Sequence, residues 1–182
     1  MPAQPVFYYD LGSPQCYLLG ETIMSTLPVV PEWEPVLASR LVATTERRPD
    51  LDRSHIERLA ADLGLQPVRW PIAWPPDTAR AMLAATYAKK VGRAVAFSLA
   101  AFRQTFAGGR DIADEDTVLI AGAACEMHPV ALTKGIDLRS TAESLDAAVT
   151  RAQAAGIRMV PAIQIEDRIY EGAEAMALGG AG

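Results

Sequence analysis

Strand-forming segments occur near the two ends of this chain, and a long helical stretch separates them. Residues 6–9 (Val-Phe-Tyr-Tyr) and residues 33–38 are rich in the branched and aromatic residues that strands favour. Residues 159–165 and 168–170 show a similar pattern and predict a hairpin. Over residues 54–127, apolar residues recur instead at three- and four-residue steps, which predicts helices. The 182 residues are enough for one core with a helical subdomain inserted in it.

The first predicted strand leads into a turn and a helix start. Residues 10–12, Asp-Leu-Gly, are a turn signal. Ser13 is a favoured N-cap, and Pro14 suits the first helical position because its missing N–H would be unpaired there. The helix should end before Pro28. With a strand at 33–38, this opening favours two parallel strands joined by a right-handed crossover.

The remaining helices are expected on either side of a rigid loop. Residues 70–76 hold two tryptophans and three prolines, which exclude regular structure. Near the C-terminus, Ser140 should cap a helix over 140–155, because Glu143 follows it at the spacing of a capping box. A turn or so of helix is expected at the C-terminal end. The other expected helices begin near residue 54, cover 78–91 and 94–106, and follow residue 114.

The charge balance excludes some classes of partner. The formal net charge is −5, and the basic residues are scattered in short groups. Nucleic acids and anionic membranes reward a basic surface, so neither is expected as a partner. The N-terminal residues show no secretory signal, and no apolar run approaches the roughly 18 residues of a membrane span. The expected location is therefore the cytoplasm.

Two cysteines, Cys16 and Cys125, lie far apart in the sequence. They form neither a disulfide framework nor a zinc-binding set, which would need more ligands at closer spacing. No metal site is expected.

Three motifs lie where the predicted strands and helices meet. Residues 7–18 (FYYDLGSPQCYL) combine a strand with Ser-Pro-x-x-Tyr at a helix start, residues 109–112 read Gly-Arg-Asp-Ile, and residues 156–165 place a glycine and Val-Pro before a strand. In this order they resemble the DsbA-like division of the thioredoxin superfamily. Within it, the chain is most similar to the group of 2-hydroxychromene-2-carboxylate isomerases and kappa-class glutathione transferases.

The resemblance covers nearly the whole chain and implies an α/β fold. It implies a thioredoxin domain (βαβ–ββα) formed by residues 1–48 and 136–182, with an all-helical domain inserted at 49–135. It also implies a cis bond before Pro161. Read without the resemblance, Pro161 is a trans proline that begins a strand. Homodimers are common in the resembled group.

The resemblance implies a thiol site at Ser13. Unpaired N–H groups and the helix dipole favour negative charge at a helix N-terminus. Thiol-redox members of the fold carry a cysteine at this position, whereas a serine would stabilise the thiolate of a bound small thiol. Val160, before Pro161, would pair with the peptide part of that thiol as an added strand. Pro14 belongs to the same predicted thiol site. Alternatively, Ser13 is only an N-cap.

One segment departs from the resembled group. Where the group has Gly-x-Asp-Arg to hold the γ-glutamyl part of glutathione, residues 172–175 read Gly-Ala-Glu-Ala. Glu174 keeps a carboxylate, and the arginine is missing. The expected cofactor is therefore glutathione or another low-molecular-weight thiol.

The predicted substrate pocket contains Asp10, Tyr17 and Trp74. Core packing is the alternative for Tyr17, and the alternative for the tryptophan loop is to seal the interface between the two parts of the chain. The substrate implied by the resemblance is a small aromatic electrophile.

Cys16 stands where the second cysteine of a Cys-x-x-Cys pair would lie. Because position 13 is serine, an internal 13–16 disulfide cannot form. Cys16 is therefore either a single reactive thiol or a residue of the core. The expected function is a thiol-dependent isomerase or transferase. The alternatives are a DsbA-like thiol–disulfide oxidoreductase that uses Cys16 alone, and a non-catalytic binding protein with this fold.

Overall fold

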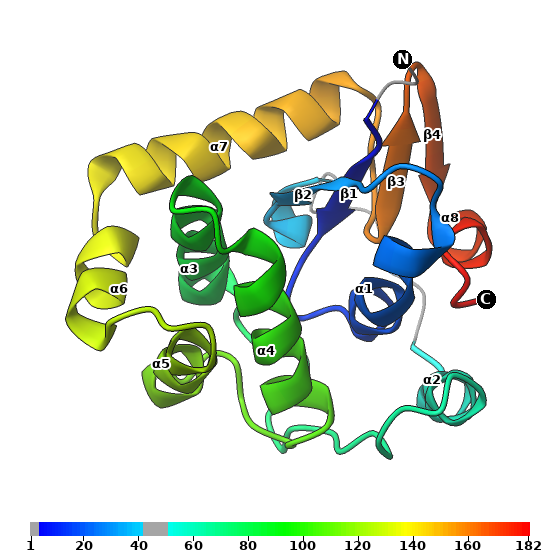
Figure 1. Ribbon diagram of the computed structural model, residues 1–182, viewed down its shortest axis with the longest axis horizontal. Helices are drawn as coiled ribbons and strands as arrows, with labels where there is room; N and C mark the ends of the chain where they lie inside the picture. The colour runs from blue at the N-terminus through cyan, green and yellow to red at the C-terminus, as the bar shows by residue number, and fades with distance from the viewer. Residues whose placement is uncertain (1–3, 42–50) are drawn as a thin grey trace.

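The computed structural model describes residues 4–41 and 51–182, and it places a four-stranded sheet beside a group of helices (Figure 1). The strands are β1 (Val6–Tyr9), β2 (Glu32–Pro35), β3 (Ala162–Ile165) and β4 (Arg168–Glu171), in the order β2-β1-β3-β4. β1 is parallel to β2 and antiparallel to β3, and β3 is antiparallel to β4. The sheet therefore joins the two ends of the chain, as a thioredoxin fold requires.

The register of β1 and β3 places the two predicted site segments at one end of the sheet. Tyr8 lies opposite Ala162, so the carboxyl end of β1 is beside the amino end of β3. The turn that carries Ser13 follows β1, and the Val160–Pro161 segment precedes β3.

Successive side chains of β1 are buried on opposite faces of the sheet. Phe7 and Tyr9 belong to the large core cluster with α1 (Pro14–Thr26). Tyr8 belongs to a second cluster, on α7 (Arg139–Ala154).

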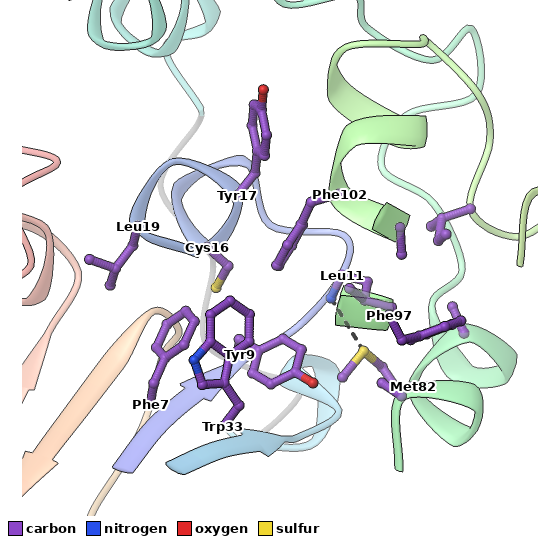
Figure 2. Packing of buried hydrophobic residues seen from close by; sticks show 14 of the residues in the cluster. Phe7, Tyr9, Leu11, Cys16, Tyr17, Leu19, Trp33, Met82, Phe97 and Phe102 are labelled. Atoms are coloured by element: carbon purple, nitrogen blue, oxygen red, sulfur yellow. Dashed lines mark hydrogen bonds between the residues drawn. The ribbon is translucent and has the colours of Figure 1, made fainter. Parts of the chain in front are cut away.

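In the described residues between β2 and β3, five α-helices precede α7. The phenyl rings of Phe97 and Phe102 in one of them are fully buried in the core cluster that also contains Tyr9 and Trp33 (Figure 2). The ring centroids of Tyr9 and Phe102 are 6.1 Å apart. The inserted helices and the sheet therefore share one continuous core. The five are α2 (Arg53–Asp62), α3 (Ala79–Lys90), α4 (Ala94–Phe106), α5 (Glu115–Ala124) and α6 (Pro129–Ile136).

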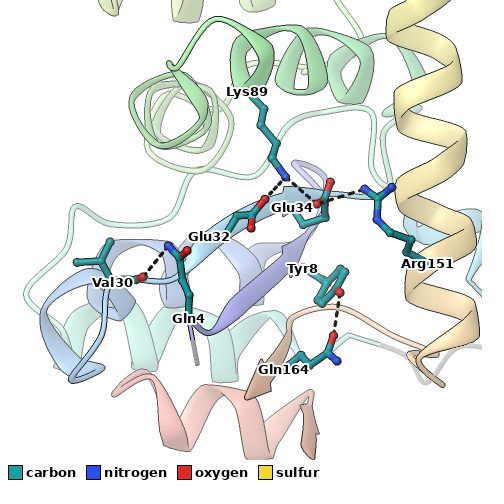
Figure 3. Close-up of polar contacts among 8 residues, drawn as sticks. All are labelled: Gln4, Tyr8, Val30, Glu32, Glu34, Lys89, Arg151 and Gln164. Atoms are coloured by element: carbon teal, nitrogen blue, oxygen red, sulfur yellow. Dashed lines mark hydrogen bonds and ion pairs between the residues drawn. The ribbon is translucent and has the colours of Figure 1, made fainter. Parts of the chain in front are cut away.

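A charged cluster ties two helices to the edge strand β2 (Figure 3). The Lys89 ammonium of α3 lies 2.6 Å from Glu34 Oε2 and 2.7 Å from Glu32 Oε1. Arg151 of α7 approaches the same Glu34 oxygen at 3.5 Å. Because the Glu34 side chain is only 11% exposed, its pair with Lys89 is screened less than an ordinary surface pair.

Three local predictions were wrong. β2 ends at Pro35 and a 3₁₀ turn, η1 (Ala38–Arg40), follows it, because the Ala38 N–H donates to the Asp10 carboxylate instead of extending the strand. β3 begins at Ala162 rather than at residue 159. The helix α7 has Leu138 as its N-cap, and Ser140 lies inside its first turn.

The expected capping box therefore does not form. Lys90 donates to the backbone oxygen and to the hydroxyl of Ser140, and Glu143 pairs with Arg139 at 2.9 Å. The short helix α6 was not predicted, although His128 and Pro129 are a cap and a first-turn proline. The first expected domain limit, between residues 48 and 49, lies outside the described residues, and α6 ends at Ile136 beside the second.

Across residues 4–41 and 51–182, no helix combines the length and the apolar character needed to cross a bilayer.

Candidate functional site

Ser13 forms the N-cap of α1, as predicted. Its Oγ accepts a hydrogen bond from the Cys16 N–H at 3.2 Å, and its own N–H donates to the Asp10 carbonyl at 3.0 Å. The hydroxyl lies 3.4 Å from Gln15 Oε1, which is long for an O–H···O hydrogen bond. Ser13 is partly exposed and Pro14 is buried. The hydroxyl therefore stands at the positive end of the α1 dipole with its proton weakly engaged.

Asp10 fixes the turn that precedes Ser13. Its buried carboxylate accepts from the N–H of Gly12 at 2.9 Å, from the N–H of Ala38 at 2.9 Å and from the hydroxyl of Thr78 at 3.1 Å. These donors belong to the turn itself, to the segment after β2 and to the start of α3. Asp10 thus joins three parts of the chain. The sequence predicted that this side chain lines a substrate pocket, and in the structure its carboxylate accepts hydrogen bonds from these protein groups.

Cys16 lies in the core. Its side chain is fully buried, and its sulfur points from α1 toward the aromatic rings of the sheet (Figure 2). Burial raises the pKa of the Cys16 thiol to about 12, and hydrogen bonding to Ser13 and to the Asp10 backbone only partly offsets this. The thiol is therefore protonated at neutral pH. Cys125 is also a buried free thiol.

We expect Cys16 to make the folded protein sensitive to alkali. The unfolded chain loses the thiol proton near the ordinary pKa of 9.0, whereas the folded chain holds it until about 12. The stabilisation is thus complete below about pH 9 and is lost as the pH rises toward 12. Urea unfolding at about pH 7 and about pH 10 measures this loss, and Cys16→Ala should reduce it. An equal loss in Cys16→Ala would show that other groups cause it.

An aromatic wall joins α1 to the inserted helices. Tyr17 stacks on Phe106 with centroids 5.5 Å apart, and Trp74 meets the same phenyl ring edge-on at 5.7 Å. Trp70 lies 5.3 Å from Trp74, and the Arg53 guanidinium lies 4.8 Å from the centroid of Trp70. Tyr17 and Trp74 are therefore in one cluster, and Phe106, which the sequence did not single out, connects them.

The loop that carries these tryptophans also packs on the Ser13 turn. A Cβ atom on Gly12 would lie 2.6 Å from Thr78 Cγ2 and 3.3 Å from Pro76 Cγ, so any other residue there would force Thr78 or the loop to shift. The Trp74–Pro75 bond in this loop is cis. The loop between α2 and α3 and the start of α3 thus cover one side of the Ser13 turn.

The Val160–Pro161 bond is cis, at the sheet end that carries the Ser13 turn. The Pro161 carbonyl accepts from the Gly172 N–H at 2.9 Å. Within the described part of the chain, neither the N–H nor the C=O of Val160 has a hydrogen-bond partner. Glu174 is exposed in the first turn of α8 (Ala173–Leu178), and no contact joins it to the Ser13 turn among residues that the structure describes.

Two further observations concern parts of the molecule away from the Ser13 turn and the Val160–Pro161 bond. An open cavity of about 210 Å³ is formed by α2 and the segment after it. It contains none of the predicted site residues, and its lining is Glu57, Ala61, Leu65, Pro67 and Val68. Over the described ranges, no group of three His, Cys, Asp or Glu side chains is arranged to hold a metal ion.

The family model of the DSBA-like thioredoxin domain matches residues 6–179 of the chain. No curated protein sequence matches the chain.

Solved structures of similar shape include a 2-hydroxychromene-2-carboxylate isomerase, with a TM-score of 0.81, 16% identity, and coverage of 93% of this chain and 89% of that one. A probable DsbA oxidoreductase from Streptomyces coelicolor gives a TM-score of 0.75 at 18% identity, covering 98% and 87%. The cytosolic disulfide reductase DsbM from Pseudomonas aeruginosa, solved with GSH, gives 0.68 at 15% identity, covering 98% and 94%. At these identities the likeness concerns the fold alone.

Proposed function

The chain belongs to the family of DSBA-like thioredoxin domains, and on this premise we propose that it is a thiol-dependent isomerase or transferase. Its cofactor would be glutathione or another low-molecular-weight thiol, and its substrate a small aromatic electrophile. The observation that carries the proposal is the hydroxyl of Ser13 at the N-terminus of α1.

The Ser13 hydroxyl suits a bound thiolate for two reasons. Its oxygen accepts from the Cys16 N–H, and its O–H, which is only weakly engaged with Gln15, can donate a hydrogen bond to the thiolate. The α1 dipole adds about 0.3–1 kcal/mol of stabilisation for a negative charge near this end of the helix. Both effects lower the pKa of a thiol bound there.

The segment before β3 would hold the rest of the thiol. Val160 offers an N–H and a C=O without partners in the described residues, which matches the pairing of an extended peptide with a strand edge. Pro14 and Pro161 would border the same ligand, and the exposed Glu174 carboxylate would receive a cationic group at its far end.

In the proposed reaction the thiolate adds to an electrophilic carbon of the substrate. A carbon–sulfur bond forms, and the electron pair of the attacked double bond moves onto the conjugated carbonyl oxygen. In an isomerase, the substrate then rotates about the carbon–carbon bond that the addition has made single. The electron pair returns to restore the double bond, and the same thiolate is expelled. A transferase takes a proton from water onto the anion and releases the thioether.

The state of Cys16 supports this proposal over a single-cysteine redox protein. A thiol–disulfide exchange reaction needs an accessible thiolate. The Cys16 thiol is fully buried and has a pKa of about 12, which opposes both conditions. Two free thiols also suit a reducing compartment, and a cytoplasmic location is part of the proposal.

Thermal unfolding with added thiols tests the proposal. A ligand that binds only the native state at one hundred times its Kd stabilises by about 2.7 kcal/mol, and we expect glutathione at millimolar concentration to raise the Tm. Ser13→Ala should lose most of this shift while it keeps its fold. Ser25→Ala, at an exposed serine of the same helix, is the matched control.

Equal shifts in Ser13→Ala and in the wild type would remove Ser13 from the thiol site. No shift with any low-molecular-weight thiol would leave a binding protein without thiol chemistry.

A further inference from the structure

Glu171 on β4 holds the chain just before Val160. One oxygen of its carboxylate, Oε1, accepts from the N–H of Arg158 at 2.7 Å and from the N–H of Met159 at 2.9 Å. Glu171 pairs with Ala162 across β3 and β4, so its position along the sheet is fixed. Two consecutive backbone donors thus converge on one charged acceptor, an arrangement stronger than two neutral hydrogen bonds.

The next residue in the chain supplies a second restraint. The N–H of Gly172 donates to the carbonyl of Pro161 at 2.9 Å. Glu171 and Gly172 therefore restrain the backbone on both sides of Val160, while the amide groups of Val160 have no partner in the described residues. The end of β4 and the residue after it thus hold this segment without using the Val160 amide groups that a ligand would need.

We propose that Glu171 is a positioning residue of the thiol site. It fixes the 158–160 backbone so that the Val160 amide groups are preorganised to pair with the peptide part of a bound thiol. This inference rests on the proposed function, and it adds a residue that touches neither the sulfur nor the substrate. Preorganisation improves affinity because less backbone freedom is lost when the ligand binds.

The test separates thiols with a peptide part from thiols without one. We measure the Kd of glutathione and of 2-mercaptoethanol by calorimetry for wild type, Glu171→Ala and Glu171→Gln. Glu171→Ala should weaken glutathione binding roughly tenfold, the equivalent of about one hydrogen bond, and leave 2-mercaptoethanol unchanged. Glu171→Gln keeps an acceptor oxygen and should recover part of the affinity.

Asp167→Ala is the matched control, because it removes an exposed carboxylate from the turn of the same hairpin. Equal weakening of both thiols in Glu171→Ala would show a general structural defect and overturn the inference, as would unchanged glutathione binding. Ser13→Ala should weaken both thiols, which distinguishes a failure at Ser13 from a failure at Glu171. A wild type that binds neither thiol overturns the proposed function and this inference together.

Discussion

Asp10→Ala should lower the free energy of unfolding by about 3–5 kcal/mol, because three donors lose the buried acceptor that they share. The carboxylate is 4% exposed and accepts from Gly12, Ala38 and Thr78. Alanine would leave two backbone N–H groups and one hydroxyl without this acceptor, and each buried unpaired donor costs about 1–3 kcal/mol. Urea unfolding at neutral pH measures the loss.

Two further variants separate the contributions of the single hydrogen bonds to this loss of stability. Thr78→Val removes one of the three donors and should cost less than Asp10→Ala. Asp10→Asn keeps one acceptor oxygen and should fall between them. A loss below about 1 kcal/mol in Asp10→Ala would mean that water replaces the carboxylate at all three donors.

Ser13→Cys should convert the chain into a dithiol oxidoreductase. The new thiol would stand at the N-terminus of α1, where thiol pKa values fall to roughly 3.5–7.5. Cys16 lies three residues later and already hydrogen-bonds to the Ser13 side chain. Burial raises the pKa of Cys16 to about 12, so the new thiol reacts first, and Cys16 follows as the resolving thiol at a rate that its small thiolate fraction limits.

The measurement is the reduction of insulin by dithiothreitol, together with mass analysis after treatment with oxidised glutathione. We expect an internal disulfide and catalysis in Ser13→Cys, and neither in the wild type. The double variant Ser13→Cys/Cys16→Ala should stop at the mixed disulfide. A folded Ser13→Cys protein that forms no internal disulfide would contradict the arrangement of the two side chains.

The strands and the first helix could be predicted because their signals are local. Val6–Tyr9 has the composition of a strand, and the Ser13-Pro14 cap needs only the residues that follow it. The start of α7 could not be predicted in this way, because Lys90, from a distant helix, occupies Ser140. The end of β2 likewise depends on the Asp10 carboxylate, which lies 28 positions before its donor Ala38.

The candidate site shows the same division. Ser13 and Cys16 could be placed on one turn from their spacing alone. The three donors to Asp10, the ring of Phe106 between Tyr17 and Trp74, and the carboxylate of Glu171 are tertiary contacts. No local pattern marks them, because each residue is ordinary within its own segment.

The place of β1 in the sheet has a consequence for synthesis on the ribosome. β1 lies between β2 and β3, and the Tyr8 hydroxyl bonds to Gln164, 156 positions later. During translation, one edge of this early strand stays open until β3 has been made. The helices between them form from local contacts in the meantime, whereas closure of the sheet waits for contacts of very long sequence separation. Release of a chain that stops before β3 would expose that edge, and such fragments should aggregate rather than accumulate as folded helical domains.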